Sequence, residues 1–315
     1  MAAAGYCHRQ YAESFAEVGQ ARELPNCGGW LLERAIPGSA LRDGMGCYPL
    51  FDCCNWAGLP LDFTGLAEAL VSVSLVVNPF ANVPETDLRR WFDVVIPFKQ
   101  HYVTDMRRPI EDLVSRQHRR NLQKARDRVQ VDVCQTPLDF LVEWCDLYGH
   151  LTARHGITGL RAFSRGAFAK QLGVPGLVMF RALANDEIVG FHLWYVGDRV
   201  AYGHLGATSA RGYEVMASYA LYWYAMQYFR SHVDWLDLGG VAGVSERESL
   251  DGLRQFKAGW ATGTRQAFLC GRVLQRGAYD RLSAERPTSN TSYFPAYREG
   301  EFISSPPRMA TVERP

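Results

Sequence analysis

The most informative stretch of the sequence is residues 177–207, LVMFRALANDEIVGFHLWYVGDRVAYGHLGA. It contains three apolar runs, at residues 177–183, 188–196 and 200–205. The pairs Asn185-Asp186 and Gly197-Asp198 separate these runs, and such pairs favour tight hairpin turns. We therefore expect a meander of three antiparallel strands.

The segments on either side of this meander predict helices and further strands. Upstream we expect a strand followed by two helices, at residues 129–134, 137–154 and 164–172. Downstream we expect a long aromatic-rich helix, a strand, a short helix and a last strand, at residues 214–229, 234–238, 251–256 and 265–270. Helical and strand periods alternate here, which is typical of an α/β unit.

The first half of the chain also mixes strands and helices. Strands are expected at residues 30–32, 46–51, 70–77 and 93–103. Pro97 predicts that the last of these has a break or lies at an edge, because proline cannot donate to a sheet ladder. A basic helix, expected within residues 111–128, marks the boundary between the two halves.

Composition indicates a soluble globular chain. It has 315 residues, 34 Lys+Arg against 33 Asp+Glu, and 47% hydrophobic residues, which suits two domains or one large one. Its eight cysteines form no CxxC pair, and His150 and His155 lie off one helical face, so no metal site is expected. With no signal peptide and no apolar run of about 20 residues, we expect a cytoplasmic protein without a membrane span.

Several motifs add to this pattern. Residues 204–207 (HLGA) end the third strand of the meander, residues 237–240 (DLGG) follow the long helix, and FKAGW occupies residues 256–260. In the first half, KQHY stands at residues 99–102 and RRNL at 119–122. Together with the order of elements, these motifs resemble the tandem-GNAT proteins related to FemX-type aminoacyltransferases.

The resemblance implies an α/β (α+β) fold of two GNAT-like units, each with a mixed central sheet flanked by helices. The units are expected at residues 1–128 and 129–285, with a C-terminal tail at 286–315 that can pack back on the first unit. The chain has no sustained heptad run and so resembles the smaller FemX-type proteins, which lack a coiled-coil arm.

The resemblance also implies an amide-forming acyltransferase that moves an aminoacyl group from aminoacyl-tRNA to an amine. No tightly bound cofactor is expected, because the activated donor arrives as a co-substrate. One alternative is an acyl-CoA-dependent N-acyltransferase whose CoA loop has diverged. Another is a non-catalytic binding module, because fold does not fix function.

The loop before the long helix favours aminoacyl-tRNA over acyl-CoA as the donor. GNAT enzymes bind the CoA pyrophosphate with a glycine-rich loop at a helix N-terminus. Here residues 207–217 read ATSARGYEVMA, with a single glycine. Glu214 at the helix start is favourable for the helix dipole but repels phosphate.

The basic helix supplies the positive argument for tRNA. Its cations suit a phosphate backbone, although a solvated helix face would have the same composition. The residues expected to bind tRNA are Arg116, Arg120, Lys124, Arg126 and Arg128.

Three residues are the catalytic candidates. Lys257, in the FKAGW segment, is expected to stabilise the oxyanion of the tetrahedral intermediate, and a surface lysine is the alternative. His204 ends a central strand and can act as general base or be a core histidine. Asp237 can orient the substrate amine or simply cap the Gly239-Gly240 turn.

The expected substrate-binding residues are Lys99, His101, Arg119, Tyr202 and Trp260. The first three are expected to face the groove between the units and to contact an anionic acceptor. The acceptor is a small amine or resembles a peptidoglycan precursor. The chain is expected to be a monomer or a dimer.

Overall fold

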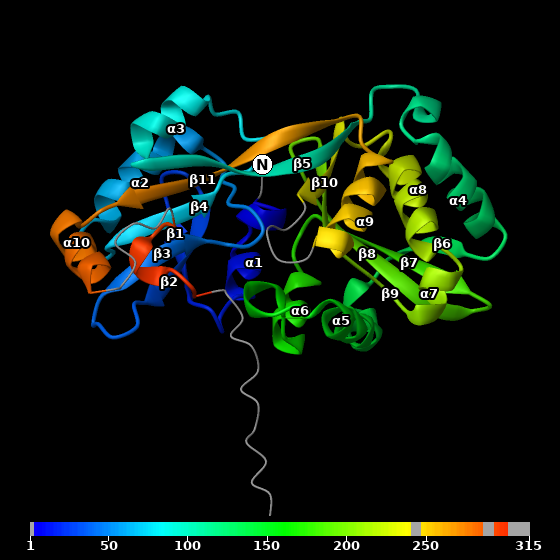
Figure 1. Ribbon diagram of the computed structural model, residues 1–315, viewed down its shortest axis with the longest axis horizontal. Coiled ribbons are helices and arrows are strands. Elements are labelled where there is room, and N and C mark those ends of the chain that lie inside the picture. Colours follow the sequence, from blue (N-terminus) through cyan, green and yellow to red (C-terminus); the bar gives the residue numbers. More distant parts are fainter. Residues whose placement is uncertain (1–2, 241–246, 286–292, 302–315) are drawn as a thin grey trace, which may run out of the picture.

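The computed structural model describes residues 3–240, 247–285 and 293–301, and of residues 247–251 only the backbone. Within these residues the strands form one continuous sheet in the order β1-β2-β3-β4-β11-β5-β10-β9-β8-β7-β6, with helices on both faces (Figure 1). The α/β fold class is confirmed.

The bounds of the strands are β1 (Gln20–Leu24), β2 (Gly29–Ala35), β3 (Arg42–Gly46), β4 (Ser72–Val76), β5 (Val94–Asp105), β6 (Gln130–Cys134), β7 (Leu177–Ala184), β8 (Glu187–Gly197), β9 (Val200–Thr208), β10 (Trp235–Gly240) and β11 (Gly263–Val273). The bounds of the α-helices are α1 (Arg9–Glu13), α2 (Leu59–Leu66), α3 (Glu85–Trp91), α4 (Arg116–Arg126), α5 (Leu141–His155), α6 (Arg165–Gln171), α7 (Ala210–Glu214), α8 (Ala217–Phe229), α9 (Arg247–Ala258) and α10 (Arg276–Ala284).

Two long strands join the halves of the molecule. β5 lies between β11 and β10, and β11 returns from the end of the second half to pair with β4 and β5 (Figure 1). Within the described residues β10 pairs with β5 only from His101 to Asp105, so at Pro97 the strand is paired on the β11 side alone, and the expectation of a break or an edge there is confirmed. Pro97 is accommodated opposite Phe268, beside a register shift between Ala267 and Phe268, where the missing N–H does not interrupt a regular ladder.

The meander β7-β8-β9 is antiparallel, as predicted. Asn185 and Asp186 have the positive φ angles of a hairpin turn. At the second turn the positive φ angles belong to Asp198 and Arg199, one residue later than the expected pair. Aspartate tolerates this conformation, which makes the shift possible.

Two other expectations are wrong. The helix expected at residues 214–229 begins only at Ala217, as α8, because Met216, with φ +62°, separates it from the short helix α7. The strand expected at residues 46–51 ends at Gly46, because β3 begins earlier, and a cis Tyr48-Pro49 peptide follows. The positive φ of Met216 falls on a residue other than glycine, so the sequence gives no sign of it.

Three buried clusters hold the layers together. One packs α4 and α8 against the second half of the sheet around Trp194, Phe229 and Trp260. A second covers the other face with α5 and α6, around Trp144. A third lies between the two halves and contains residues of both, among them Tyr11. None of the described helices is long and apolar enough to cross a membrane.

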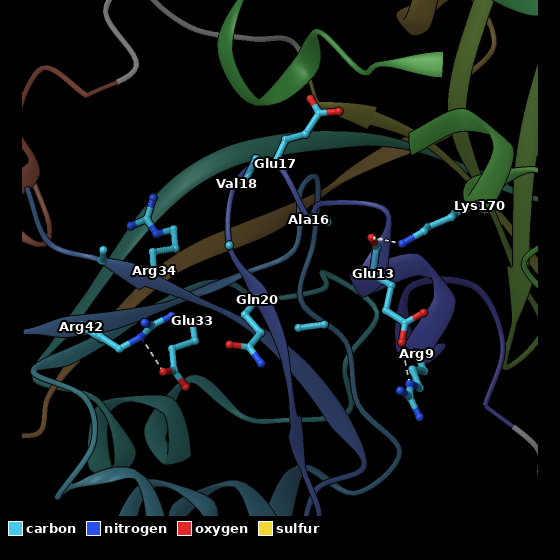
Figure 2. Close-up of a pocket in the computed structure, with 13 residues that line it drawn as sticks. Arg9, Glu13, Ala16, Glu17, Val18, Gln20, Glu33, Arg34, Arg42 and Lys170 are labelled. Atoms are coloured by element: carbon cyan, nitrogen blue, oxygen red, sulfur yellow. Dashed lines mark hydrogen bonds and ion pairs between the residues drawn. The ribbon is translucent and has the colours of Figure 1, made fainter. Parts of the chain in front are cut away.

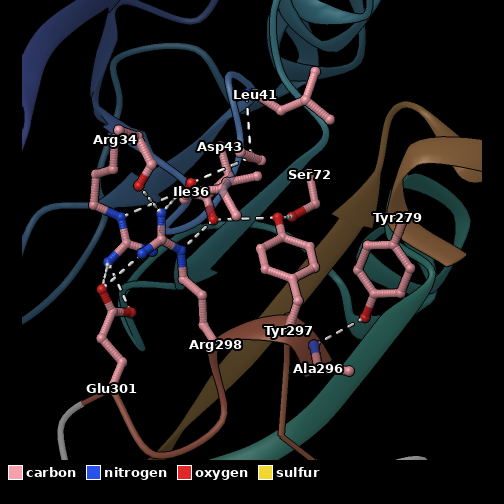
Figure 3. Close-up of polar contacts among 12 residues, drawn as sticks. Arg34, Ile36, Leu41, Asp43, Ser72, Tyr279, Ala296, Tyr297, Arg298 and Glu301 are labelled. Carbon is pink, nitrogen blue, oxygen red and sulfur yellow. Dashed lines mark hydrogen bonds and ion pairs between the residues drawn. The ribbon is translucent and has the colours of Figure 1, made fainter. Parts of the chain in front are cut away.

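The described part of the C-terminal segment, residues 293–301, packs on the first half (Figure 3). Arg298 donates to both carboxylate oxygens of Asp43, which is fully buried. Arg34 forms ion pairs with Asp43 and Glu301, and Tyr297 donates to Asp43. The contact is thus a buried network of charges rather than a purely apolar one.

Candidate functional site

The candidate site lies where β9 and β10 separate. These parallel strands pair only from Trp235 and Val200 to Asp237 and Tyr202. After Asp237, β10 shifts its register against β5 before Gly240 pairs with His101. Gly239 has φ +76°, a conformation that other residues rarely adopt. The DLGG motif therefore bends the backbone at this point.

Lys257 reaches this bend from α9. Its side chain is buried, and its ammonium donates to the carbonyl of Gly240 at 2.8 Å. Burial lowers the pKa of Lys257 to about 8, with a further lowering from Lys99 that Asp237 opposes. This lysine is a buried group and not the surface lysine of the alternative interpretation.

His101 and Asp237 form a buried pair beside it. Nδ1 of His101 lies 3.0 and 2.9 Å from the two carboxylate oxygens of Asp237, and the backbone N–H of Gly239 donates to the same carboxylate at 2.7 Å. A Cβ on Gly239 would lie 3.3 Å from the Lys257 ammonium. The bend thus brings Lys257, His101 and Asp237 together.

Two further cations approach this cluster. Burial lowers the pKa of Lys99, and the charge of Arg161 lowers it further. Arg161 ends a short 3-10 helix after α5, in a segment that has no distinctive sequence motif. Sequence reasoning missed Arg161, because only the packing of the two halves brings it near Lys99.

His204 lies elsewhere, among aromatic rings between the halves. Its ring nitrogens pair with the hydroxyl of Tyr6 and the amide oxygen of Gln171, each at 3.3 Å. Burial lowers its pKa to about 3, so it stays neutral at pH 7. This environment suits the core histidine that was the alternative, while His101 has the carboxylate partner of an oriented base.

Tyr202 and Trp260 are also buried. The Tyr202 hydroxyl accepts a hydrogen bond from Asn78, and Trp260 packs against His118 and Tyr222. Their predicted contacts with substrate stay predictions.

The predicted tRNA-binding residues form one exposed surface on and just after α4. All five, Arg116, Arg120, Lys124, Arg126 and Arg128, are exposed. Arg119 lies with them and donates to the carbonyl of Glu111, so the structure does not place it with Lys99 and His101. A helix in which every cation is exposed can offer them to a phosphate backbone.

His118 connects this basic helix to the FKAGW segment. It is buried, and its Nε2 bonds to the carbonyl of Phe256 at 2.8 Å. A Cβ on Gly259 would lie 2.1 Å from the His118 ring, which explains the glycine of the motif. Ser115, the N-cap residue of α4, also donates its backbone N–H to the carbonyl oxygen of Gly259. The two motifs therefore form one packed unit.

We expect Gly259→Ala to lower the free energy of unfolding by about 1–3 kcal/mol, because overpacking forces a buried ring to move. Urea unfolding measures the change. Gly252→Ala is the matched control: Gly252 lies within α9, which ends just before Gly259, and it has open space around it, so the substitution should be neutral or stabilising. Equal effects of the two substitutions would contradict the close packing at His118.

The loop before α8 is not built as an open phosphate cradle. Ser209 caps α7 by accepting from the N–H of Gly212 at 3.0 Å, and Glu214 pairs with Arg211. A Cβ on Gly212 would lie 2.3 Å from the carbonyl oxygen of Val189. The single glycine of the loop is thus required by packing against β8.

A cavity of about 540 Å³ lies at α1, β1 and β2, away from these residues (Figure 2). Most of its charged side chains have protein partners: Arg9 pairs with Glu13, Arg42 with Glu33, and Lys170 donates to the Glu13 carbonyl. None of the predicted site residues lines it. We therefore place the candidate site at the β9–β10 bend. No group of three or more His, Cys, Asp or Glu within the described ranges is arranged to hold a metal ion.

Residues 114–257 match the acetyltransferase (GNAT) domain family. This segment, which is less than half of the chain, is similar to a GNAT acetyltransferase domain. Its structure is similar to that of FemX, with a TM-score of 0.64 and 13% identity over 86% of this chain and 92% of that one. It is also similar to the C-terminal domain of a putative lysylphosphatidylglycerol synthetase from Agrobacterium fabrum, with a TM-score of 0.61 and 17% identity over 90% and 93% of the two chains.

A third similar structure is L-PGS from Bacillus licheniformis, with a TM-score of 0.56 and 14% identity over 86% of this chain and 94% of that one. At these identities the likeness is one of fold. The likeness in fold to these structures extends over more of the chain than residues 114–257, which match the GNAT family. No protein with a curated function matches the sequence.

Proposed function

We propose that this protein transfers an aminoacyl group from aminoacyl-tRNA to an amine acceptor. The observation that carries the proposal is the buried Lys257 ammonium beside the His101–Asp237 pair at the β9–β10 bend. An acyl transfer needs a base for the amine and a positive group for the developing oxyanion, and this cluster offers both.

The expected reaction has two steps. The neutral amine attacks the ester carbonyl, a C–N bond forms, and His101 Nε2 takes the proton that the amine loses. The Lys257 ammonium stabilises the negative oxygen. When the intermediate collapses, the C–O bond to the ribose breaks and the leaving oxygen receives the proton. Hydrogen bonding of Nδ1 to Asp237 keeps Nε2 as the basic nitrogen.

Asp237→Asn tests this pair. The amide cannot hold the imidazolium that forms during proton transfer, so we expect kcat to fall roughly 10²-fold or more while the fold is kept. Single-turnover kinetics with aminoacyl-tRNA measures the step, with circular dichroism as the check on folding. An Asp237→Asn variant of undiminished kcat would remove the base from the mechanism.

The basic helix and the capped loop before α8 support tRNA as the donor. The exposed cations lie on and just after α4, and His118 of α4 contacts Phe256 of α9, the helix that contains Lys257. The N–H of Gly212 is already used by Ser209. We propose that α4 tracks the tRNA backbone and that Lys99 and Arg161 face an anionic part of the substrates.

Filter binding of aminoacyl-tRNA over a salt series tests the donor. Replacing Arg120 and Lys124 by Gln removes two exposed charges, and we expect the slope of log K against log salt to fall by roughly 1.5–2. The matched control replaces Arg89 and Arg90, two exposed arginines of α3 in the first half, and should leave the slope unchanged. No retention of tRNA at low salt would reject the proposal.

The second candidate is an acyl-CoA-dependent N-acyltransferase, which the acetyltransferase family match favours. Acetyl-CoA as a competitor in the same experiment separates the two donors. Displacement of tRNA by micromolar acetyl-CoA, or acetyl transfer to amines, would favour the CoA reading. In either case the acceptor is proposed to be a small amine or a compound like a peptidoglycan precursor.

A further inference from the structure

A second, smaller cavity of about 170 Å³ lies between the N-terminal segment, the first half and the β8–β9 hairpin. Its walls include the carboxylates of Asp52 and Asp198 and the buried rings of Tyr6, Tyr195 and Tyr202. Among the described residues that line it there is no lysine, arginine or histidine. The cavity therefore gathers negative charge and aromatic surface without a cation of its own.

Asp52 is held in a fixed position at this cavity. One carboxylate oxygen accepts from the backbone N–H of Cys53 at 2.9 Å, and the other accepts from the Asn78 amide at 2.7 Å. A carboxylate has about four acceptor positions, so each oxygen retains capacity for a ligand. The same Asn78 amide donates to the Tyr202 hydroxyl at 2.8 Å, which fixes one aromatic wall relative to the acid.

The electrostatics of the cavity favour a cation. Burial raises the pKa of Asp52 to about 6; its hydrogen bonds from Asn78 and Cys53 oppose this rise, and the charge of Asp198 adds to it. At pH 7 the carboxylate is still mostly ionised, so the cavity holds a partly buried negative charge that no lining side chain neutralises. Such a charge is costly unless it is paired, and aromatic faces add attraction for a cation.

Tyr202 connects the cavity to the candidate site. Tyr202, on β9, is the register partner of Asp237 on β10. Both Asp52 and Asp237 contribute to raising the pKa of Tyr202, after the larger effect of burial, so this ring lies within the field of both carboxylates. A ligand in the cavity therefore lies one side chain away from the His101–Asp237 pair.

We propose that this cavity is a binding subsite for a primary ammonium group carried on a short aliphatic chain, with Asp52 as its counter-ion. The volume admits such a group but not a nucleotide. Binding of an ammonium ion at this subsite does not depend on the proposed transfer reaction, whereas the identity of the molecule that carries the ammonium rests on it. The ammonium belongs either to the acceptor or to the aminoacyl end of the donor.

Isothermal titration calorimetry with n-butylammonium chloride at constant ionic strength tests the subsite, with n-butanol as the neutral probe. We expect millimolar binding of the ammonium and no heat with the alcohol. Asp52→Asn should weaken binding roughly tenfold, because a charged hydrogen bond is lost. Asp234→Asn is the control, since Asp234 contacts the turn of the same hairpin through its ion pair with Arg199 but does not line the cavity.

Two additional measurements keep the test decisive. Asp198 lies in an exposed turn whose backbone conformation asparagine tolerates, so Asp198→Asn should fold. This variant should weaken binding of the ammonium, and it tests the subsite even if Asp52→Asn does not fold. Affinity should fall as the pH drops through about 6, where Asp52 takes up a proton. Burial raises the pKa of Tyr6, Tyr202 and Cys7, so these groups stay neutral in that range.

Paired probes separate the two sources of the ammonium. Tighter binding of 1,4-diaminobutane than of n-butylammonium assigns the subsite to an amine acceptor. Tighter binding of L-alanine methyl ester assigns it to the aminoacyl donor. Equal affinity for n-butanol and n-butylammonium, or unchanged affinity in folded Asp52→Asn and Asp198→Asn, would overturn the proposal. These binding results stand whether or not the protein transfers an acyl group.

Discussion

Replacing Lys257 by Met is expected to reduce the rate of acyl transfer roughly 10²–10³-fold, the usual effect of removing one group that stabilises an oxyanion. Methionine keeps the length and the apolar stem of the side chain but removes the ammonium that donates to Gly240. Single-turnover kinetics with the activated donor measures the effect. Substrate binding should change much less, because the charge is needed mainly when the oxyanion forms.

The pH dependence provides an independent readout of the same residue. Burial lowers the pKa of Lys257 to about 8, so the ammonium is present below pH 8 and is lost as the pH rises through that value. We expect the rate of the chemical step to fall on the alkaline side with that midpoint. Lys257→Arg keeps its charge above pH 10 and should abolish this alkaline limb.

A control variant guards against an indirect effect. Lys170→Met removes a lysine that donates to the carbonyl of Glu13, at the cavity far from the β9–β10 bend. It should leave the rate and its alkaline limb unchanged. A Lys257→Met enzyme with wild-type kcat would show that the lysine is only structural and would remove the oxyanion role.

The largest effect on stability is expected from Asp43→Asn. Asp43 is fully buried and is the shared partner of Arg34 and Arg298 (Figure 3). Removing the charge of Asp43 leaves Glu301 as the carboxylate that pairs with the two buried guanidinium groups. Breaking a buried ion pair lowers the free energy of unfolding by about 3–5 kcal/mol. Urea unfolding followed by circular dichroism gives the difference in the free energy of unfolding.

Glu85→Gln is the matched control for this variant. Glu85 pairs with Arg89 on the exposed surface of α3, where solvent screens the interaction, and little change is expected. Limited proteolysis adds a structural readout, because loss of the Asp43 network should expose residues 293–301 to cleavage first. Equal stability of Asp43→Asn and the wild type would show that the C-terminal segment contributes nothing to the fold.

The sequence alone predicted the local structure well where short-range chemistry dominates. The Asn185-Asp186 turn, the Ser164 cap of α6 and the basic helix α4 are all present, because turn propensity, capping and helical period act over a few residues. The prediction was wrong at Met216 and at residues 46–51. At Met216, packing imposes a positive φ on a residue other than glycine, for which the local sequence carries no signal.

The candidate site was predicted in part. Lys257, Asp237 and His101 were each identified, two of them with other roles, but their meeting was not. Their proximity depends on the register shift of β10 against β5 and on the positive φ of Gly239. Residues separated by 136 positions in the chain, His101 and Asp237, become partners only through that register.

The sequence by itself thus determined the class of fold and the residue types at the bend, since periodicity and motif order are properties of the chain. Only the tertiary structure decided which histidine has a carboxylate partner, that Arg161 approaches Lys99, and that Asp52 and Tyr202 line one cavity. The physical reason is that these contacts join segments far apart in the chain. The burial that shifts the pKa values of these groups also exists only once both halves have packed together.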